Sequence, residues 1–202
     1  MPIACLNGAF LARDNRSGYA KITLLFSGRE TMPGVNDSTS VLLLTANDWV
    51  PNNPRLPVLI YRQIFTADEK AIATAQTLFE RNGWPAQWVD GIYPYHHYHS
   101  NAHEVLAIAR GEARLMLGGP KGEQVVVRGG DIVLLPAGTG HCNLHSSDDF
   151  TVVGAYPPEQ QFDLCRGAPT AEMLAAIANA PFPHCDPVYG EKGPLIKNWV
   201  NI

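Results

Sequence analysis

The sequence predicts an all-β fold, a sandwich or barrel of short antiparallel strands. Glycine (18 residues) and proline (16 residues) are abundant in the 202-residue chain, which suits a fold with many tight turns. Short apolar segments follow one another at close, regular spacing, with glycine turns and no helical pattern between them. The hydrophobic share of 46% is enough for a substantial core. The seven predicted strands are Gly91–His99, Glu104–Ala109, Ala113–Leu117, Gln124–Val127, Ile132–Leu135, Cys142–His145 and Phe150–Ala155.

The segment at the start of the chain differs from the rest. Gly28–Ser40 is rich in turn-forming residues and poor in large apolar ones, so we expect a loop or disorder there. Tyr19–Phe26 could form a short strand. We therefore divide the chain into a partly disordered N-terminal extension, residues 1–40, and a single domain, residues 41–202. The sequence leaves open whether the extension belongs to the fold.

One strand and one helix are expected ahead of the seven strands. Leu56–Phe65 is β-branched and aromatic, which favours a strand. Thr66 and Glu69 form a capping box, and Gly83 supplies a stop, so the sequence predicts a helix over residues 67–82. Its apolar face should cover the sheet from outside the barrel. The apolar positions at helical spacing are Ile72, Ala75, Leu78 and Phe79.

The C-terminal part carries a second helical pattern. Thr170–Ala178 predicts a short helix. The closing segment, residues 186–200, is expected to be a loop that packs back on the domain through Leu195 and Trp199.

Charge and cysteine usage limit the partners and the compartment. The formal net charge is −4 and the basic residues do not cluster, so nucleic acid and acidic membrane surfaces are not expected partners. No stretch is long and apolar enough for a spanning helix, and the first ten residues lack the basic region of a secretory signal. The cysteines are scattered and are expected to be reduced thiols, which favours the cytoplasm. They are Cys5, Cys142, Cys165 and Cys185.

Four donor residues could converge on a metal ion. His97 and His99 are two residues apart, so on a strand they point to the same face. Glu104 follows a Ser-Asn turn that can bring its carboxylate alongside them, and His141 is available as a fourth donor. Such a set suits one divalent transition metal, Fe, Mn, Ni, Co or Zn, and the ligand types do not choose among them.

These residues resemble the two signature motifs of the cupin superfamily. The first motif, Gly–x5–His–x–His–x4–Glu–x6–Gly, is met at Gly91, His97, His99, Glu104 and Gly111. The second, Gly–x5–Pro–x–Gly–x2–His–x3–Asn, is met at Gly130, Pro136, Gly138 and His141, whereas His145 replaces its final asparagine. Two ordered motifs about twenty residues apart make coincidence negligible.

The resemblance extends to a group of small, single-domain bacterial cupins of YjlB-like type, over roughly residues 48–202. The superfamily implies a double-stranded β-helix (jelly-roll, RmlC-like) barrel. The two helical patterns add one flanking helix before this barrel and a short C-terminal helix. It also implies a metal at one end of the barrel, frequent dimerisation and therefore a homodimer. For the YjlB-like group it implies no particular substrate.

Two functions remain open at this stage. The first is a metal-dependent enzyme, of oxygenase or isomerase type, that acts on a small oxygen-rich metabolite; the second is a non-catalytic, small-molecule-binding or sensory cupin. The mixed set of three histidines and one glutamate differs from closed, thiolate-rich structural zinc sites and favours the first. No residue is assigned a catalytic role beyond the ligands, and no cofactor other than the metal is expected.

Several neighbouring residues have a structural interpretation beside a functional one. His96 and His103 are out of phase with the ligands, although a register one residue shorter would make His103 the donor instead of Glu104.

His145 is interpreted as a hydrogen-bonding residue, with a proton-transfer role as the alternative. Cys142 is expected in the core rather than as a nucleophile. The tyrosines in phase with His97, Tyr93 and Tyr95, either fill the barrel or line its pocket.

Overall fold

The computed structural model describes residues 39–199. The predicted strand Tyr19–Phe26 lies outside the described residues, as does nearly all of the predicted extension. The first strand, β1 (Ser40–Leu42), begins at the last residue assigned to that extension.

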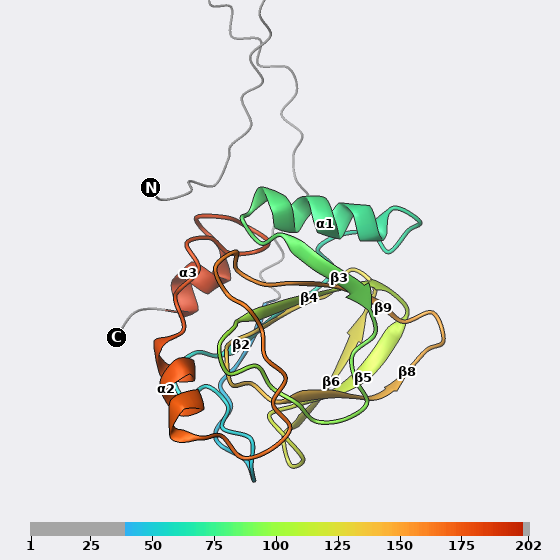
Figure 1. Ribbon diagram of the computed structural model, residues 1–202. Helices are drawn as coiled ribbons and strands as arrows, with labels where there is room; N and C mark the ends of the chain where they lie inside the picture. Colours follow the sequence, from blue (N-terminus) through green and yellow to red (C-terminus); the bar gives the residue numbers. More distant parts are fainter. Residues whose placement is uncertain (1–38, 200–202) are drawn as a thin grey trace, which may run out of the picture.

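Two antiparallel sheets form the domain (Figure 1). The larger sheet has the strand order β1-β2-β7-β4-β9-β3, and the smaller has the order β6-β5-β8. Strands that are consecutive in the sequence are often not adjacent in these sheets, as expected for a jelly-roll barrel. The predicted fold class is confirmed. The strands are β2 (Val58–Tyr61), β3 (Ala86–Asp90), β4 (Glu104–Arg110), β5 (Glu112–Leu117), β6 (Glu123–Arg128), β7 (Ile132–Leu135), β8 (His141–Ser146) and β9 (Thr151–Ala155).

Alternation along β4 separates two hydrophobic cores. Leu106 and Ile108 face the barrel interior, where they pack with buried residues of both sheets such as Leu115 and Val133. The intervening residues of β4 face the opposite side and pack beneath α1 (Ala71–Arg81). Glu104 is in phase with the inward-facing set, so the strand carries its carboxylate into the barrel.

The helix α1 covers the outer face of the larger sheet, as predicted (Figure 1). It begins at Ala71 rather than at residue 67, and no side chain caps its N-terminus. The predicted capping box is wrong because Asp68 forms a turn there instead: its carboxylate accepts a hydrogen bond from the amide of Lys70, and its carbonyl accepts one from Ala71.

Two predicted strands are shortened or absent. The predicted strand Leu56–Phe65 is reduced to β2, because Pro57 precedes it and Gln63 adopts a positive φ of 51° after it. Gly91–His99 forms no regular strand, and only isolated bridges occur, at His97 and at its neighbour. Pro94 interrupts this segment and cannot donate a ladder hydrogen bond.

The C-terminal segments lie on one side of the barrel (Figure 1). The predicted second helix is present as α2 (Ala171–Asn179), and Thr170 caps it by accepting a hydrogen bond from the amide of Met173. The predicted loop contains a short helix, α3 (Pro194–Asn198). Leu195 and Trp199 are buried against the domain, as expected.

The cysteines agree only in part with the expectation of reduced thiols. Cys142 and Cys165 are buried and free, whereas Cys185 is disulfide-bonded, so the expectation is wrong for Cys185. Within residues 39–199 there is no helix that is both long and apolar enough to cross a membrane. The cytoplasmic location stays a prediction.

Candidate metal centre

The backbone brings the four predicted donors together at one end of the barrel interior. His97 exchanges two backbone hydrogen bonds with His141, of 2.9 and 3.2 Å, so the irregular segment is tied to the first residue of β8. The carbonyl of His99 accepts a hydrogen bond from the amide of Gly138, at 2.7 Å. Glu104 opens β4. All four side chains are buried.

Each imidazole is oriented by a main-chain carbonyl. Nδ1 of His97 lies 3.1 Å from the carbonyl of Tyr95, and Nδ1 of His141 lies 3.1 Å from that of Thr139. Nδ1 of His99 contacts the carbonyl oxygen of Asp163. A carbonyl can only accept, so each Nδ1 carries the hydrogen. In the neutral ring, Nε2 is then left with a free lone pair.

The three histidines offer their ligand atoms to a common point. These atoms lie within 4.8 Å of one another, which is compatible with one metal ion. Burial and the neighbouring His141 lower the pKa of His97 to about 3, so this ring is neutral. A neutral imidazole is the form that binds a metal.

Glu104 places a carboxylate beside two of these histidines. Its Oε2 lies 3.3 Å from Nε2 of His99 and 3.3 Å from Nε2 of His141. Burial alone would raise the pKa of Glu104, but His99 and His141 hold it well below its usual range, so the group is ionised. Oε2 is buried and has no hydrogen-bond partner of acceptable geometry in the part of the chain that the structure describes. An unpaired buried carboxylate oxygen is costly unless a cation neutralises it.

The charge of Glu104 also affects the pKa of His99. Burial lowers its pKa, but the contacts with Glu104 and Asp163 outweigh burial and raise it. A proton on His99 would neutralise its contact with Glu104, as would a bound metal cation. Three imidazole nitrogens and one carboxylate oxygen are a donor set that suits borderline divalent metals, so the residues present fit such an ion.

Tyr156 fixes the other oxygen of the carboxylate. Its hydroxyl donates a hydrogen bond of 2.5 Å to Oε1 of Glu104 and accepts one of 3.1 Å from the indole of Trp88. Burial and the adjacent Glu104 raise the pKa of Tyr156, so its hydroxyl keeps its proton. The pair of bonds leaves Oε2 as the oxygen that faces the histidines.

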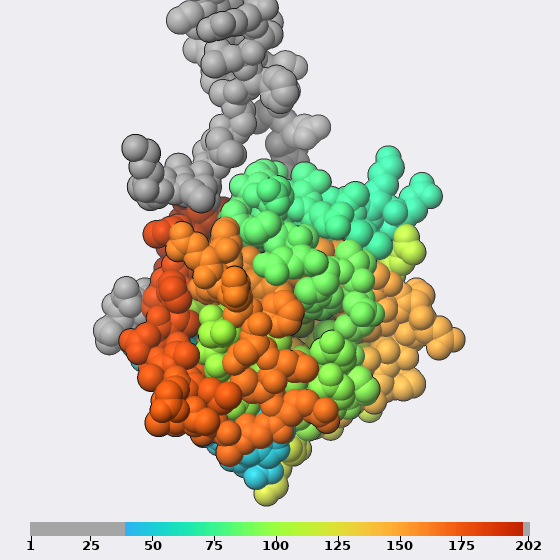
Figure 2. Space-filling view, in the orientation of Figure 1, coloured from blue at the N-terminus to red at the C-terminus, as the bar shows by residue number. Residues whose placement is uncertain are grey.

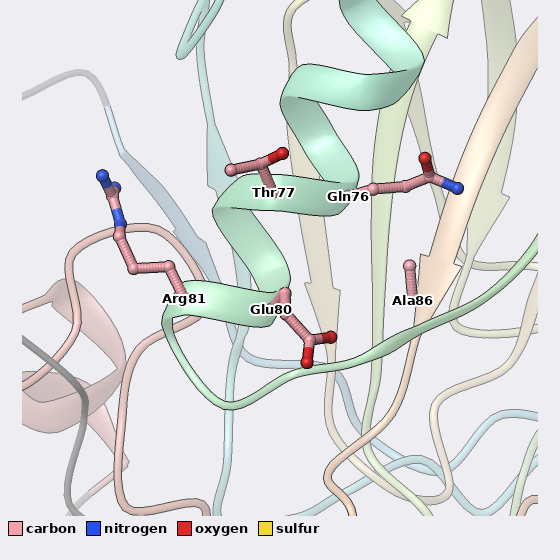
Figure 3. Close-up of a pocket in the computed structure, with 5 residues that line it drawn as sticks. All are labelled: Gln76, Thr77, Glu80, Arg81 and Ala86. Carbon is pink, nitrogen blue, oxygen red and sulfur yellow. The ribbon is translucent and has the colours of Figure 1, made fainter. Parts of the chain in front are cut away.

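A pocket of about 230 Å³ opens onto the four donors. Part of its wall comes from the segment between β9 and α2, which crosses this end of the barrel (orange in Figures 1 and 2). Figure 3 shows a different hollow, on α1, where Glu80 and Arg81 extend in different directions and none of the four donors is present.

The structural interpretation of His103 and His96 is supported. His103 is fully buried on the α1 side of the larger sheet, where its ring packs 4.8 Å from that of Trp199. Its Nδ1 accepts a hydrogen bond from the amide of Ala137, and burial lowers its pKa to about 4. Nε2 of His96 lies 3.7 Å from Sγ of Cys142. The shorter register with His103 as the donor is therefore wrong.

The other neighbours take different places. His145 is exposed on β8 and does not line the pocket. Cys142 is buried, and burial raises the pKa of its thiol, so it is not an activated nucleophile. Tyr93 lines the pocket and stacks on Tyr95 with ring centroids 4.8 Å apart, while Arg166 lies 4.0 Å from the centre of the Tyr95 ring.

The residues that sequence analysis missed lie mainly after β9. Tyr156 and Asp163 hold Glu104 and His99, and Phe162 stacks on Tyr156 at 4.7 Å. The carboxylate of Asp163 in turn accepts hydrogen bonds of 2.6 Å from the amide and from the hydroxyl of Ser100. This segment has neither a motif nor a periodic pattern, so its aromatic residues offered the sole signal.

Comparisons with known proteins agree with this description. Residues 89–153 match the Cupin domain family. The uncharacterized protein YjlB of Bacillus subtilis (strain 168) is 42% identical over 153 residues, which cover 75% of this chain and 90% of YjlB.

The similar solved structures have low scores. A mutant of Bacillus subtilis oxalate decarboxylase is 15% identical, with a TM-score of 0.34. The match covers 68% of this chain and 36% of the decarboxylase chain. A DUF861 family protein from Thermotoga maritima is 17% identical, covering 48% of this chain and 96% of its own, with a TM-score of 0.29. Procruciferin from Brassica napus is 18% identical, covering 55% of this chain and 23% of its own, with a TM-score of 0.30. By its long match to YjlB and its cupin domain, this chain belongs to the cupin family, among the YjlB-like small cupins.

Proposed function

We propose that His97, His99, Glu104 and His141 bind one divalent transition metal and that the protein is a metal-dependent enzyme. Its substrate is a small oxygen-rich metabolite, and its reaction is of oxygenase or isomerase type. The observation that carries this proposal is the convergence of three oriented imidazoles, two of which lie 3.3 Å from the unpaired Oε2 of Glu104.

The surrounding residues hold the donors in place before any ligand arrives. Main-chain carbonyls orient the imidazoles, and Tyr156 orients the carboxylate. Because these partners are fixed by the fold, little reorganisation accompanies binding. A bound divalent metal supplies Lewis-acid polarisation of a carbonyl oxygen and, if it is iron, oxygen chemistry. The pocket admits a small ligand to this point, between walls that are largely apolar.

Metal analysis of purified protein tests the proposal. Protein isolated without oxygen is expected to carry close to one metal ion per chain, and the double variant His97→Ala/His99→Ala should carry almost none. The exposed His145→Ala is the matched control and should retain the metal. The double variant should keep its fold, because the two hydrophobic cores do not depend on the metal ion. Absence of metal from the wild-type protein, together with no tight binding or rise in Tm on adding metals, would refute the proposal.

A non-catalytic ligand-binding or sensory role is the second candidate. It is favoured by the hydrogen bonds that join Trp88, Tyr156 and Glu104, because they leave none of these groups free for acid–base work on a ligand. Turnover of diketones, hydroxy-acids and sugars by Fe(II)-, Mn(II)- and Ni(II)-loaded protein separates the two. Binding of one of these compounds without conversion supports the sensory role, and conversion supports the enzyme.

We also propose that the protein forms a homodimer. Among residues 39–199, β1 is an edge strand of the larger sheet, and it carries Val41 with 52% of its surface exposed, beside the exposed Leu43. An unpaired apolar edge favours association with a second copy.

A further inference from the structure

The pocket above the four donors is largely apolar. Leu106 and Ile92 line it and are buried, and Phe162 and Leu164 line it with 47% and 45% of their surfaces exposed. Trp88 and two tyrosines complete the aromatic part of the wall. A ligand that binds the donors therefore places the rest of its body against rings and aliphatic side chains.

The polar groups on the pocket floor are already paired with one another. The hydroxyl of Tyr156 donates to Glu104 and accepts from Trp88, so its one hydrogen and the indole N–H are both occupied. The imidazole Nδ1 groups contact carbonyl oxygens. None of these groups has a donor left to bind a second carboxylate on a ligand, so among the described lining residues the hydroxyl of Tyr93, which is 50% exposed, is the neutral side-chain donor that remains.

The charges near the pocket also disfavour a dianion. Among the described residues that line it, the charged groups are Glu104 and Asp90, and there is no lysine or arginine. A divalent cation beside Glu104 leaves one net positive charge, which a singly charged ligand neutralises. A dianion would leave an uncompensated negative charge in an apolar pocket that already faces Asp90.

The size of the pocket sets a limit on the ligand. Its volume of about 230 Å³ corresponds to roughly eight water molecules at ~30 Å³ each. A ligand with on the order of ten non-hydrogen atoms fits, whereas drug-sized ligands fill pockets from about 300 Å³ upwards.

We infer that this pocket binds a neutral or singly charged ligand with an apolar body and two adjacent oxygen atoms, of the hydroxyketone or diketone class, and that it rejects dicarboxylates. This inference rests on the metal centre proposed above. Arg166 does not supply the missing positive charge, because it lies against the ring of Tyr95 and does not line the pocket.

Calorimetric titration of zinc-loaded protein with three probes tests the inference. Maltol binds a metal through two adjacent oxygen atoms as a singly charged anion and has an apolar ring. Acetohydroxamate binds with the same charge but has no ring, and oxalate is a dianion. Maltol should have a Kd at least tenfold lower than that of oxalate, with acetohydroxamate between them. Oxalate binding as tightly as maltol would overturn the inference, as would loss of zinc to maltol without a complex on the protein.

Zinc content measured before any probe is added separates the two proposals. If the protein does not retain zinc or another divalent metal, the metal centre itself fails. If it retains the metal but prefers oxalate, the centre stands and the inference about the ligand fails.

Substitutions at the pocket wall provide a second test. Leu164→Lys should lower the Kd for oxalate at least fivefold by adding a positive charge, without changing the zinc content. Leu174→Lys is the matched control, because Leu174 is equally exposed, at 48%, but lies on α2 and does not line the pocket. Arg166→Gln should leave all three affinities unchanged. An equal effect of both lysine substitutions, or loss of oxalate binding in Arg166→Gln, would contradict the inference.

Discussion

Replacing Tyr156 by phenylalanine removes one hydroxyl and tests how Glu104 is held. The hydroxyl donates to Oε1 of Glu104 at 2.5 Å, and the tyrosine is 2% exposed. A hydrogen bond to a charged group contributes about 1.5–3 kcal/mol, so the free energy of unfolding of the metal-free protein should fall by about 2 kcal/mol. Losing a group that orients a metal ligand lowers metal affinity by about 10- to 100-fold, so the Kd for zinc should rise by that factor.

Tyr61→Phe provides a matched control for this prediction. Tyr61 is fully buried, and its hydroxyl donates a hydrogen bond of 2.7 Å to the buried carboxylate of Asp186, which does not line the pocket. This variant should therefore lose a similar amount of stability and no metal affinity. Urea denaturation measures the first quantity, and competition titration with a zinc-binding dye measures the second. Unchanged zinc affinity in Tyr156→Phe, or equal losses of affinity in both variants, would refute the reasoning.

Three other predictions follow from the structure. Asp163→Ala should raise the Kd for zinc by about tenfold, because it removes the carboxylate that ties down the turn whose carbonyl orients His99. Dye competition measures the change, and an unchanged Kd would show that His99 is held without this turn. Burial and Asp163 raise the pKa of Cys165 to about 11 from 9.0. At pH 8 the thiol should therefore react with Ellman's reagent about 100-fold more slowly than an ordinary thiol, and the rate should rise as the pH approaches 11. Equal rates in native and urea-unfolded protein would contradict this. Light scattering at micromolar concentration should give the mass of a dimer, and Val41→Lys should lower it towards 22.0 kDa, whereas a monomeric wild-type protein would rule out the homodimer.

Much of the barrel could be predicted from the sequence because its strands are short, alternating and separated by glycine turns. The predicted strand Ile132–Leu135 agrees with β7 at both ends, and the inward phase of Glu104 follows from the alternation along β4. The start of α1 could not be predicted, because the side chain of Asp68 competes with the expected cap for the local amides.

The donors could be named from their spacing, but not the groups that orient them. A motif records residues that share one strand or turn, whereas Tyr156 and Asp163 reach the centre from a segment without regular structure. Their roles depend on tertiary contacts between residues far apart in the chain, and a single sequence does not encode those contacts as a local pattern. The expected strand over Gly91–His99 failed for a related reason: convergence of its histidines depends on pairing with β8 rather than on strand periodicity.

The reciprocal main-chain pairing of His97 with His141 has a consequence for metal exchange. Two of the four donors are spaced by peptide hydrogen bonds and Tyr156 holds the Glu104 carboxylate, so the same donor arrangement meets ions of different radius. A scaffold of this kind sorts poorly among first-row metals, whose intrinsic affinities follow the Irving–Williams series. We therefore expect the ion recovered with the protein to change with the growth medium, and reconstitution with a chosen metal to identify the active form better than the metal content of any one preparation.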